Sequence, residues 1–389
     1  MNILFISHEA SRTGAPLALL YLLREIKSRT KDISFTVLQL EGGPLTNDFR
    51  KLCQVIIPNE APWKVEHLFK RDTIRERLSI RFLFRSLKKR HFDLLYANTV
   101  ISLPTAVALK KQLSIPLLLH AHEAITLMRR RGVQANLIKE CDYFISASGI
   151  VYDSLISFGA PSNRIHTIYP FSEFAERIIS ANKLSSYTKD IILKDKMLIG
   201  FIGSLIERKG ADFLPMIIRR LHDLYPDCNY EIQCIGTYME GVSKKVKYDL
   251  GRIGMKDKLH DMGSVNDPLS LYMNLDFLLV LSREDPFPLA VVENGLLGKP
   301  CILFDGSCGT QRFIKDGENG IIVPYLDIDG MANAIHQLCE DREKRLDMGR
   351  KFKETLTNHY RQFRTNDEII KLLLQILNDI KIDSNTHKD

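Results

Sequence analysis

Short apolar runs alternate along the chain with longer segments whose apolar residues have helical spacing. In the first half, the runs that we predict to be strands are Asn2–Ser7, Ser34–Leu38, Gln54–Ile57, Leu94–Ala97, Leu117–Ala121 and Tyr143–Ala147. Continuous apolar runs of this length are typical of strands that are buried on both faces. Because helical segments separate several of them, we expect a parallel sheet with helices on both faces.

A second alternation of the same kind begins at Leu198. Its later strands are predicted at Tyr230–Ile235, Phe277–Leu281, Cys301–Phe304 and Gly320–Val323. The polar stretch before it lacks clear periodicity and is interpreted as a linker, and 389 residues are enough for two domains with separate cores. The expected organisation is an N-terminal α/β domain (1–172), a linker (173–196), a C-terminal α/β domain (197–360), and a final helix and tail (361–389).

The composition is that of an ordinary globular protein, with 45% hydrophobic and 26% charged residues. Seven cysteines are scattered without a C-x-x-C pair, which argues against a zinc site or a disulfide framework and favours a reducing compartment. The N-terminal sequence runs directly into a predicted strand, so we expect no signal peptide, and the longest apolar runs are too short to span a membrane. These features predict a cytoplasmic protein.

The positive charge is concentrated in the N-terminal half. Residues 1–170 contain 24 Lys/Arg and 14 Asp/Glu, and the segment 63–91 interleaves basic residues with bulky apolar ones. Such a segment fits an anionic membrane surface, at the inner face of the cytoplasmic membrane. A core helix with a solvated basic face is the alternative, and no motif supports nucleic-acid binding. The residues proposed for this surface, or for the acceptor side, are Lys70, Arg71, Arg75, Arg81, Arg85, Lys88, Lys89 and Arg90.

Two acids follow the predicted strand Phe277–Leu281. Asp285 lies in the turn, and Glu293 lies inside the apolar helix that begins at Leu289. A carboxylate in a buried helix is unfavourable unless it has a partner. Glu293 is therefore either a binding residue or a structural acid that accepts hydrogen bonds from backbone donors.

Three other predicted strand ends carry candidate chemistry. Arg208 and Lys209 precede a helix and could clamp a phosphate, and Gly14 leaves room for one at the start of another helix. The absence of G-x-G-x-x-G disfavours a dinucleotide-dependent dehydrogenase. His120 and His122 could bind a metal or belong to a polar loop, and since nothing completes a ligand shell, we predict no metal site.

These motifs together resemble the retaining glycosyltransferases of family 4, which have the GT-B fold. The resemblance covers nearly the whole chain and rests on TGAP (13–16), His122, GSLIERKG (203–210), EDPFPLAVVENG (284–295), GKPCI (298–302) and DGSCGTQRFIKDGENGIIV (305–323). It implies two Rossmann-like domains that face a central cleft, with the C-terminal helix crossing back to the N-terminal domain. It also implies a nucleotide-diphosphate sugar as donor, a glycan or lipid-linked saccharide as acceptor, and no cofactor.

The same resemblance implies roles for individual residues. Glu293 would hold the donor ribose, and Asp285 would contact the hydroxyl groups of the donor sugar. Lys209 and Arg208 would neutralise the diphosphate, which Gly14 would approach from the other domain, and His122 would lie near the reacting sugar. The backbone of Phe287, Pro288 and Leu289 would lie against sugar and diphosphate. The implied catalytic residues are His122, Asp285 and Lys209.

The sequence departs from the family pattern at several positions. Asp285 stands where the family has Glu, Ser204 where many members have Arg, and Arg312 where an acid is common. Two alternatives to a transferase therefore stay open. One is a nucleotide-sugar 2-epimerase of the same fold, with His122 or Glu123 as acid/base groups, and the other is a nucleotide-sugar-binding scaffold with a decayed site.

Overall fold

The computed structural model describes residues 1–58, 83, 85–180, 196–237, 240–265 and 267–386. The chain divides into two compact units: unit 1 contains residues 1–170 and 364–389, and unit 2 contains residues 171–363.

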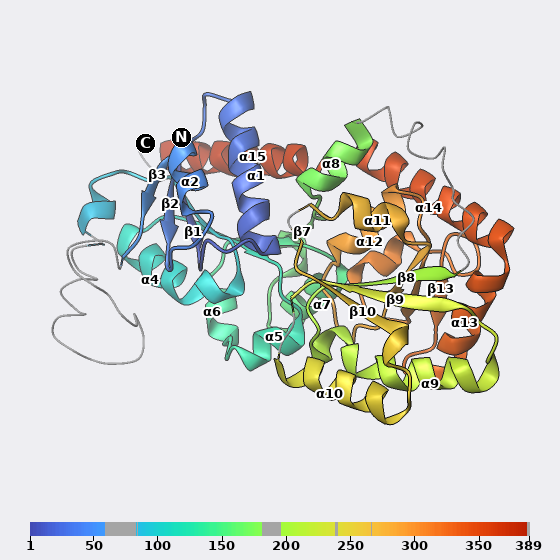
Figure 1. The fold of residues 1–389 in the computed structure, drawn as a ribbon. Helices are drawn as coiled ribbons and strands as arrows, with labels where there is room; N and C mark the ends of the chain where they lie inside the picture. The colour runs from blue at the N-terminus through green and yellow to red at the C-terminus, as the bar shows by residue number, and fades with distance from the viewer. Residues whose placement is uncertain (59–82, 84, 181–195, 238–239, 266, 387–389) are drawn as a thin grey trace. The chain divides into compact units, whose positions relative to one another are not determined.

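Unit 1 is built on a parallel sheet, of which Figure 1 labels β1, β2, β3 and β7. The strand order is β3-β2-β1-β4-β5-β6-β7. The order reverses at β1, because β2 and β4 pair with opposite edges of that strand. The six strands expected from the apolar runs are present, whereas the short β7 was not expected because its residues are only partly buried. The bounds are β1 (Asn2–Ser7), β2 (Ser34–Gln39), β3 (Gln54–Ile56), β4 (Leu94–Ala97), β5 (Leu117–Ala121), β6 (Tyr143–Ser146) and β7 (Ile165–Thr167).

Helices cover both faces of this sheet. Successive side chains of a strand point to opposite faces, so Ile3 and Phe5 join one core and Leu4 and Ile6 join the other. The first core is completed by α1 (Gly14–Arg29) and α2 (Thr46–Leu52), and the second by helices on the opposite face. Further helices in the described part of residues 1–170 are α4 (Leu103–Leu113), α5 (Ile125–Arg130), α6 (Ala135–Lys139) and α7 (Gly149–Ser157).

The last helix of the chain, α15 (Thr365–Thr386), belongs to unit 1 and lies against α1 (Figure 1). Leu373 and Leu377 are buried in the core that α1 also lines. Arg29 of α1 forms an ion pair with Asp367, and the Thr365 hydroxyl donates to the Tyr169 carbonyl over 2.6 Å. The expected return of the C-terminal helix to the N-terminal domain is confirmed.

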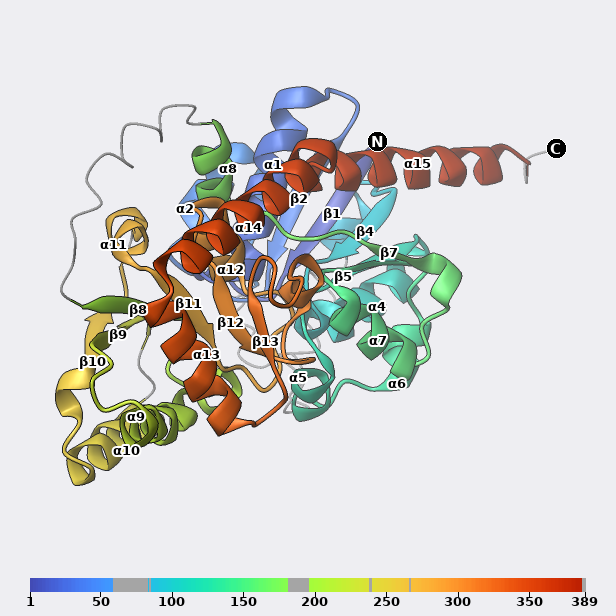
Figure 2. The same ribbon diagram turned by 90° about the vertical axis from the view of Figure 1, so that its right-hand side faces the viewer.

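Unit 2 contains a second parallel sheet, in the order β10-β9-β8-β11-β12-β13 (Figure 2). Its strands are β8 (Met197–Ile202), β9 (Tyr230–Ile235), β10 (Leu259–Gly263), β11 (Phe277–Val280), β12 (Cys301–Phe304) and β13 (Ile321–Val323). The edge strand β10 was not expected, because half-exposed polar residues hide its pattern. The helices are α8 (Glu173–Ser180), α9 (Leu214–Leu224), α10 (Glu240–Arg252), α11 (Leu269–Asn274), α12 (Leu289–Leu296), α13 (Ile328–Glu340) and α14 (Arg342–Gln362).

The two faces of this sheet are covered by different helices. Phe277 and Leu279 pack in a core with α9, α10 and α13, and α12 and α14 pack on each other (Figure 2). Gly295 permits this approach, because a Cβ atom there would lie 2.5 Å from the side chains of Phe352 and Leu356. Each unit is therefore a parallel sheet between two helical layers, as the apolar pattern predicts.

The first residues of the predicted linker 173–196 are not a linker but the helix α8, which packs against α12. Ala175 and Ile178 are buried there, three positions apart on one helical face. The polar composition of the stretch concealed this short amphipathic pattern. The rest of the predicted linker, 181–195, lies outside the described residues.

Among the described residues, none of the helices is both long and apolar enough to cross a lipid bilayer.

Candidate active site

In each sheet, the chain adds strands first toward one edge and then toward the other. The reversal lies between two neighbouring strands. In unit 2 these strands are β8 and β11, and in unit 1 they are β1 and β4. Ligands of open parallel sheets bind outside the carboxyl ends of the strands at such a switch point. The polar residues that follow these four strands are therefore the candidates for binding and chemistry.

At the switch point of unit 2, the loop after β8 meets the turn after β11. The Lys209 ammonium group forms an ion pair with Oδ2 of Asp285, whose side chain is buried. Arg208 Nη1 lies 3.8 Å from Oδ1 of Asp285 and donates to the Glu284 carbonyl over 2.8 Å. Two cations and one buried carboxylate thus share one site at the strand ends.

This loop is held in place by backbone geometry and by a second ion pair. Gly210 has a φ of +74°, and a Cβ atom there would lie 1.9 Å from the Leu281 carbonyl oxygen. The Arg283 guanidinium makes two 2.8 Å bonds to the Asp212 carboxylate, and its backbone N–H donates to the Arg208 carbonyl over 2.8 Å. The structure thereby fixes the backbone that carries the phosphate-binding candidates.

The start of α12 lies directly after Asp285. Pro288 is its N-cap, and no side chain among the described residues caps the helix N-terminus. The Phe287 ring packs against Phe313, with 6.3 Å between the ring centroids, so its side chain faces the interior. The unpaired N–H groups at a helix start attract anions. In α12 these groups begin at Leu289, close to Asp285.

Glu293 lies inside α12 and has a side-chain partner. The Ser172 hydroxyl donates to Oε1 of Glu293 over 2.7 Å, although 121 residues separate the two positions. Burial raises the pKa of Glu293, and the Ser172 hydrogen bond partly opposes that rise. The alternative of a structural acid held by backbone donors has no support among the described contacts. Sequence reasoning missed Ser172 because no local pattern links it to Glu293.

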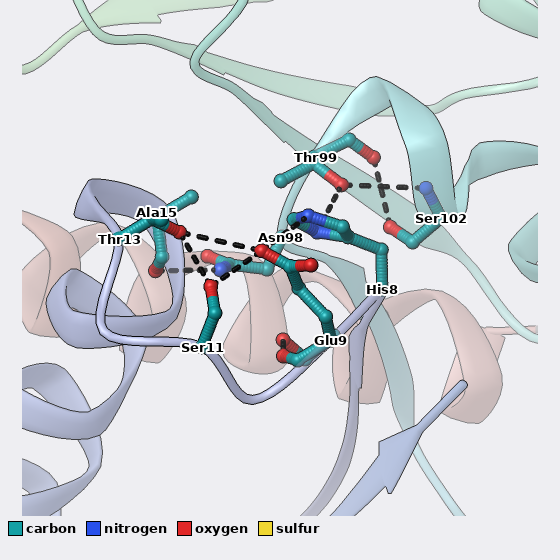
Figure 3. Close-up of polar contacts among 9 residues, drawn as sticks. His8, Glu9, Ser11, Thr13, Ala15, Asn98, Thr99 and Ser102 are labelled. Atoms are coloured by element: carbon teal, nitrogen blue, oxygen red, sulfur yellow. Dashed lines mark hydrogen bonds and ion pairs between the residues drawn. The ribbon is translucent and has the colours of Figure 1, made fainter. Parts of the chain in front are cut away.

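A polar network occupies the switch point of unit 1 (Figure 3). Ser11 donates to the Glu9 carboxylate and lies 2.8 Å from the Thr13 hydroxyl. The Asn98 amide donates to the Ala15 carbonyl over 2.9 Å, so the residue after β4 holds the start of α1. These polar residues immediately follow two apolar strands, β1 and β4. That position in the sequence could have identified them as candidates for the site.

Gly14 is the first residue of α1. A Cβ atom at this position would meet nothing within 4 Å, and the N-cap Thr13 makes no side-chain cap bond to the helix, because its hydroxyl turns to Ser11 instead. The helix start therefore has open space beside it, which is consistent with the approach of a ligand to Gly14.

Histidines gather at the carboxyl ends of β1 and β5. The ring of His122 lies 4.0 Å from that of His120, whose Nδ1 is 2.6 Å from the Tyr96 hydroxyl. Burial lowers the pKa of His122 to about 4, and a nearby His8 adds to this effect. His122 Nε2 is buried and has no hydrogen-bond partner among the described residues. A neutral imidazole with a free nitrogen can donate to or accept from a ligand hydroxyl.

Glu123 lies beside this pair and is buried. Its Oε2 accepts from the backbone N–H groups of Val100 and His122 over 3.2 and 3.1 Å. Burial nevertheless raises the pKa of Glu123 to about 7. The residue could therefore exchange a proton near neutral pH.

The basic segment 63–91 lies largely outside the described residues. This holds for Lys70, Arg71, Arg75 and Arg81. Within the described part, Leu83 and Leu87 are buried, while Arg85, Lys88 and Lys89 are exposed and Arg90 pairs with Gln54. This spacing is that of a helix with an apolar face and a basic face, which both interpretations of the segment allow.

No group of three or more His, Cys, Asp or Glu side chains in the described ranges is arranged to hold a metal ion. Near β5, His120 Nδ1 lies 2.6 Å from the Tyr96 hydroxyl and its ring packs on that of His122.

Two family models match the chain. The model for glycosyl transferases group 1 matches residues 187–355, and the model for glycosyltransferase family 4 matches residues 19–172. The lipopolysaccharide core biosynthesis glycosyltransferase LpsE of Rhizobium meliloti is 27% identical over 180 residues, which is 46% of this chain and 50% of the relative. The chain thus spans about half the length of the first curated relatives it matches.

Other similar proteins cover more of the chain. The N-acetyl-alpha-D-glucosaminyl L-malate synthase of Bacillus anthracis is 22% identical over 307 residues, which is 76% of this chain and 77% of that protein. Among solved structures, Anabaena HepE in complex with UDP-glucose superposes with a TM-score of 0.75 at 18% identity, covering 96% of this chain and 100% of HepE. The galactosyltransferase WaaB superposes with a TM-score of 0.69 at 16% identity, covering 92% of this chain and 100% of WaaB.

The structural neighbours share the fold of two α/β units, and the two family models together span most of the chain. The chain belongs to glycosyltransferase family 4 (glycosyl transferases group 1) and has the GT-B fold.

Proposed function

We propose that this protein is a retaining glycosyltransferase that moves a sugar from a nucleotide-diphosphate sugar to a glycan or lipid-linked saccharide acceptor, in the synthesis of a cell-surface polysaccharide or glycoconjugate. One observation carries the proposal. Lys209, Arg208 and Asp285 share a site at the switch point of unit 2, next to the start of α12. This cluster combines fixed cations with a hydrogen-bonding carboxylate, as a diphosphate-linked sugar requires.

The cations have a direct role in the proposed reaction. When the bond between the sugar and the donor phosphate breaks, negative charge develops on the leaving diphosphate. Lys209, Arg208 and the N–H groups at the start of α12 would stabilise that charge, and preorganised groups of this kind contribute strongly to catalysis. We propose that this stabilisation makes a metal ion unnecessary. The departing phosphate oxygen would take the proton of the acceptor hydroxyl on the same face, which retains the anomeric configuration.

The acids would select the donor. Glu293 would accept hydrogen bonds from the ribose hydroxyls, with Ser172 holding one of its oxygens in place. Asp285 would contact the hydroxyls of the transferred sugar. Because Lys209 pairs with Asp285, a bound diphosphate would compete with Asp285 for the same ammonium group and so turn the carboxylate toward the sugar.

Unit 1 would bind the acceptor, and its polar switch-point network supports this assignment. Gly14 would approach the donor diphosphate, which the open space beside it allows. His122 would contact the transferred sugar as a neutral hydrogen-bonding group, because its pKa is low. Its replacement by alanine should reduce turnover more than donor affinity.

A nucleotide-sugar 2-epimerase is the second candidate, because Glu123 has a pKa near neutrality and lies next to His122. Incubation of the donor without acceptor separates the two functions. A transferase leaves the donor sugar unchanged, whereas an epimerase produces a new nucleotide sugar, which chromatography of the reaction mixture would detect.

The test of the donor site begins with a thermal-shift screen of UDP-, GDP- and ADP-sugars. With the donor that stabilises the protein, we expect Lys209→Ala to lower kcat/KM by a factor of about 100 to 1,000, because it removes a cation that stabilises the transition state. Lys353→Ala is the matched control, since Lys353 is exposed on α14 of the same unit. Full turnover by a folded Lys209→Ala variant with that donor would show that the site is misassigned.

The same screen also tests the alternative that the protein is a nucleotide-sugar-binding scaffold with a decayed site. Such a protein would be stabilised by a nucleotide sugar and yet release no nucleotide with any acceptor tested. The anomeric configuration of the product, measured by NMR, distinguishes retention from inversion.

We also propose that the basic surface, including Arg85, Lys88 and Lys89, holds the protein at the inner face of the cytoplasmic membrane. Sedimentation with vesicles should show binding that increases with anionic lipid and decreases with salt. Absence of binding to anionic vesicles at low salt would reject this part of the proposal.

A further inference from the structure

Glu123 connects two neighbouring loops of unit 1 through a single carboxylate oxygen. Its Oε2 accepts the backbone N–H of His122 over 3.1 Å and that of Val100 over 3.2 Å. His122 follows β5 and Val100 follows β4, and these two strands pair in the sheet. Glu123 is only 6% exposed, so both hydrogen bonds are shielded from water. One buried oxygen thus holds the loop that carries His122 against the loop after β4.

The loop after β4 is itself held in place (Figure 3). The Thr99 hydroxyl oxygen accepts the backbone N–H of Ser102 over 3.3 Å, and the Ser102 hydroxyl donates to the Thr99 carbonyl over 2.8 Å. Thr99 Oγ1 also lies 3.2 Å from His8 Nδ1. The loop that offers the Val100 N–H is therefore anchored to the loop after β1.

The orientation of the His122 ring depends on its backbone. The Nε2 atom is buried and makes no hydrogen bond within the described ranges. The ring packs on that of His120, with 4.0 Å between the centroids. The direction in which Nε2 points is therefore set by the His122 backbone and by this packing. Because Glu123 is bonded to that backbone, the loss of its acceptor oxygen should let the ring shift.

The two hydrogen bonds of Glu123 do not require a negative charge. A carboxylate, a neutral carboxylic acid and a carboxamide all have an oxygen that can accept two N–H groups. Burial raises the pKa of Glu123 to about 7, so both protonation states occur near neutral pH and each keeps the acceptor. Both donors are backbone groups, which do not titrate. These contacts favour a geometric role over proton transfer.

We propose that Glu123 is a positioning residue, which bonds the loops after β4 and β5 together and so keeps His122 oriented for its contact with the transferred sugar. The role of His122 rests on the proposed function, whereas the bond between the two loops is independent of it. A misplacement of about 1 Å near the reacting groups can lower a rate by about 100-fold. Glu123 thus supports turnover without touching the substrate.

The test compares Glu123→Gln with Glu123→Met in the full-length protein. The two new side chains have similar length and volume, but only glutamine keeps an acceptor oxygen. With a donor and acceptor that support transfer, we expect Glu123→Met to lower kcat by a factor of about 10 to 100, while the donor KM changes by less than about twofold. The conservative Glu123→Gln should retain kcat within about threefold and keep the shape of its pH profile.

Amide hydrogen exchange measured by NMR gives a second readout that needs no substrate. The N–H groups of His122 and Val100 should exchange slowly in the wild type and in Glu123→Gln, and at least about tenfold faster in Glu123→Met. The N–H of Leu118, inside β5, reports opening of the sheet. The acceleration at the two loop amides is therefore measured relative to Leu118.

Equal exchange of the two loop amides in Glu123→Gln and Glu123→Met would overturn the proposal. A loss of turnover in Glu123→Gln as large as that in Glu123→Met would also overturn it, because Glu123 would then act through its charge or its proton. If the wild-type protein transferred no sugar from any donor, the proposed function would be rejected. The exchange measurement would still decide whether Glu123 joins the two loops.

Discussion

Asp285 is the residue at which the chain departs most informatively from its family's pattern. Its short side chain holds the Lys209 ammonium group and lies near Arg208. Removing one member of a buried ion pair leaves an uncompensated buried charge. The loss of stability is therefore much larger than for an exposed ion pair. The shortened acid therefore has a structural partner, and it serves the geometry of the cations as well as the proposed contact with the sugar.

Glu123 leads to a prediction about pH. Burial raises the pKa of Glu123 to about 7 in the folded protein, whereas an unfolded glutamate titrates near 4.3. The folded state therefore favours the protonated acid. This stabilisation is present below about pH 4.3 and is lost as the pH rises to about 7, a difference of about 4 kcal/mol. The wild-type unfolding free energy should fall over this window relative to that of Glu123→Gln.

Urea unfolding of both proteins at pH 5 and pH 8 measures this difference. Both proteins contain the same histidines, so the histidine contributions cancel when the two unfolding free energies are subtracted. Asp153→Asn, an exposed acid on α7, is the control and should leave the pH dependence of the wild type unchanged. If the unfolding free energies of the wild type and Glu123→Gln changed equally between pH 5 and pH 8, the assigned pKa shift would be contradicted.

At the scale of the element, the loop after β8 depends on one glycine. Gly210 and Gly254 have nearly the same φ, +74° and +72°, but only Gly210 lies close to another backbone, that of Leu281. Gly254→Ala should therefore cost about 1–2 kcal/mol for its backbone conformation alone. Gly210→Ala should cost at least about 2 kcal/mol more and should also weaken donor binding, because Lys209 is adjacent. Denaturation midpoints of unit 2 and a donor titration would measure both effects.

Equal destabilisation by the two alanine substitutions would mean that the loop can move away from Leu281. In that case, the position of Lys209 would not depend on this close approach.

The elements that sequence reasoning missed share a physical feature. β7 and β10 lie at sheet edges, and their residues are partly exposed. An edge strand needs no continuous apolar run, because solvent satisfies its outer side. The central strands were predicted with nearly correct bounds for the opposite reason, since both faces of each must be buried in helices. The helix α8 was missed because its apolar pattern is short: among the helix residues whose burial is described, only Ala175 and Ile178 are deeply buried.

At the scale of the whole molecule, the C-terminal helix stabilises the unit that begins the chain. Leu373 is fully buried in unit 1, so Leu373→Ala should lower the stability of that unit by about 2–5 kcal/mol. Leu346→Ala on α14 is the control, since that side chain is 46% exposed and its loss should change stability by less than about 0.5 kcal/mol.

Hydrogen exchange followed by mass spectrometry assigns the effect to a unit. Peptides of β1 and β4 should exchange faster in Leu373→Ala, whereas those of β8 and β11 should not. Faster exchange confined to unit 2 would contradict the assignment of α15 to the core of unit 1.

Apolar periodicity predicted the α/β class, the two sheets and the polar strand ends, because it is a local property that each segment carries alone. It also placed Lys209, Asp285 and Glu293 at strand or helix positions suited to binding. The tertiary structure decided which of these residues meet. Lys209 reaches Asp285 across 76 residues because β8 lies beside β11, and Ser172 reaches Glu293 because α8 packs on α12. Strand order and helix packing depend on long-range burial, which no local pattern encodes.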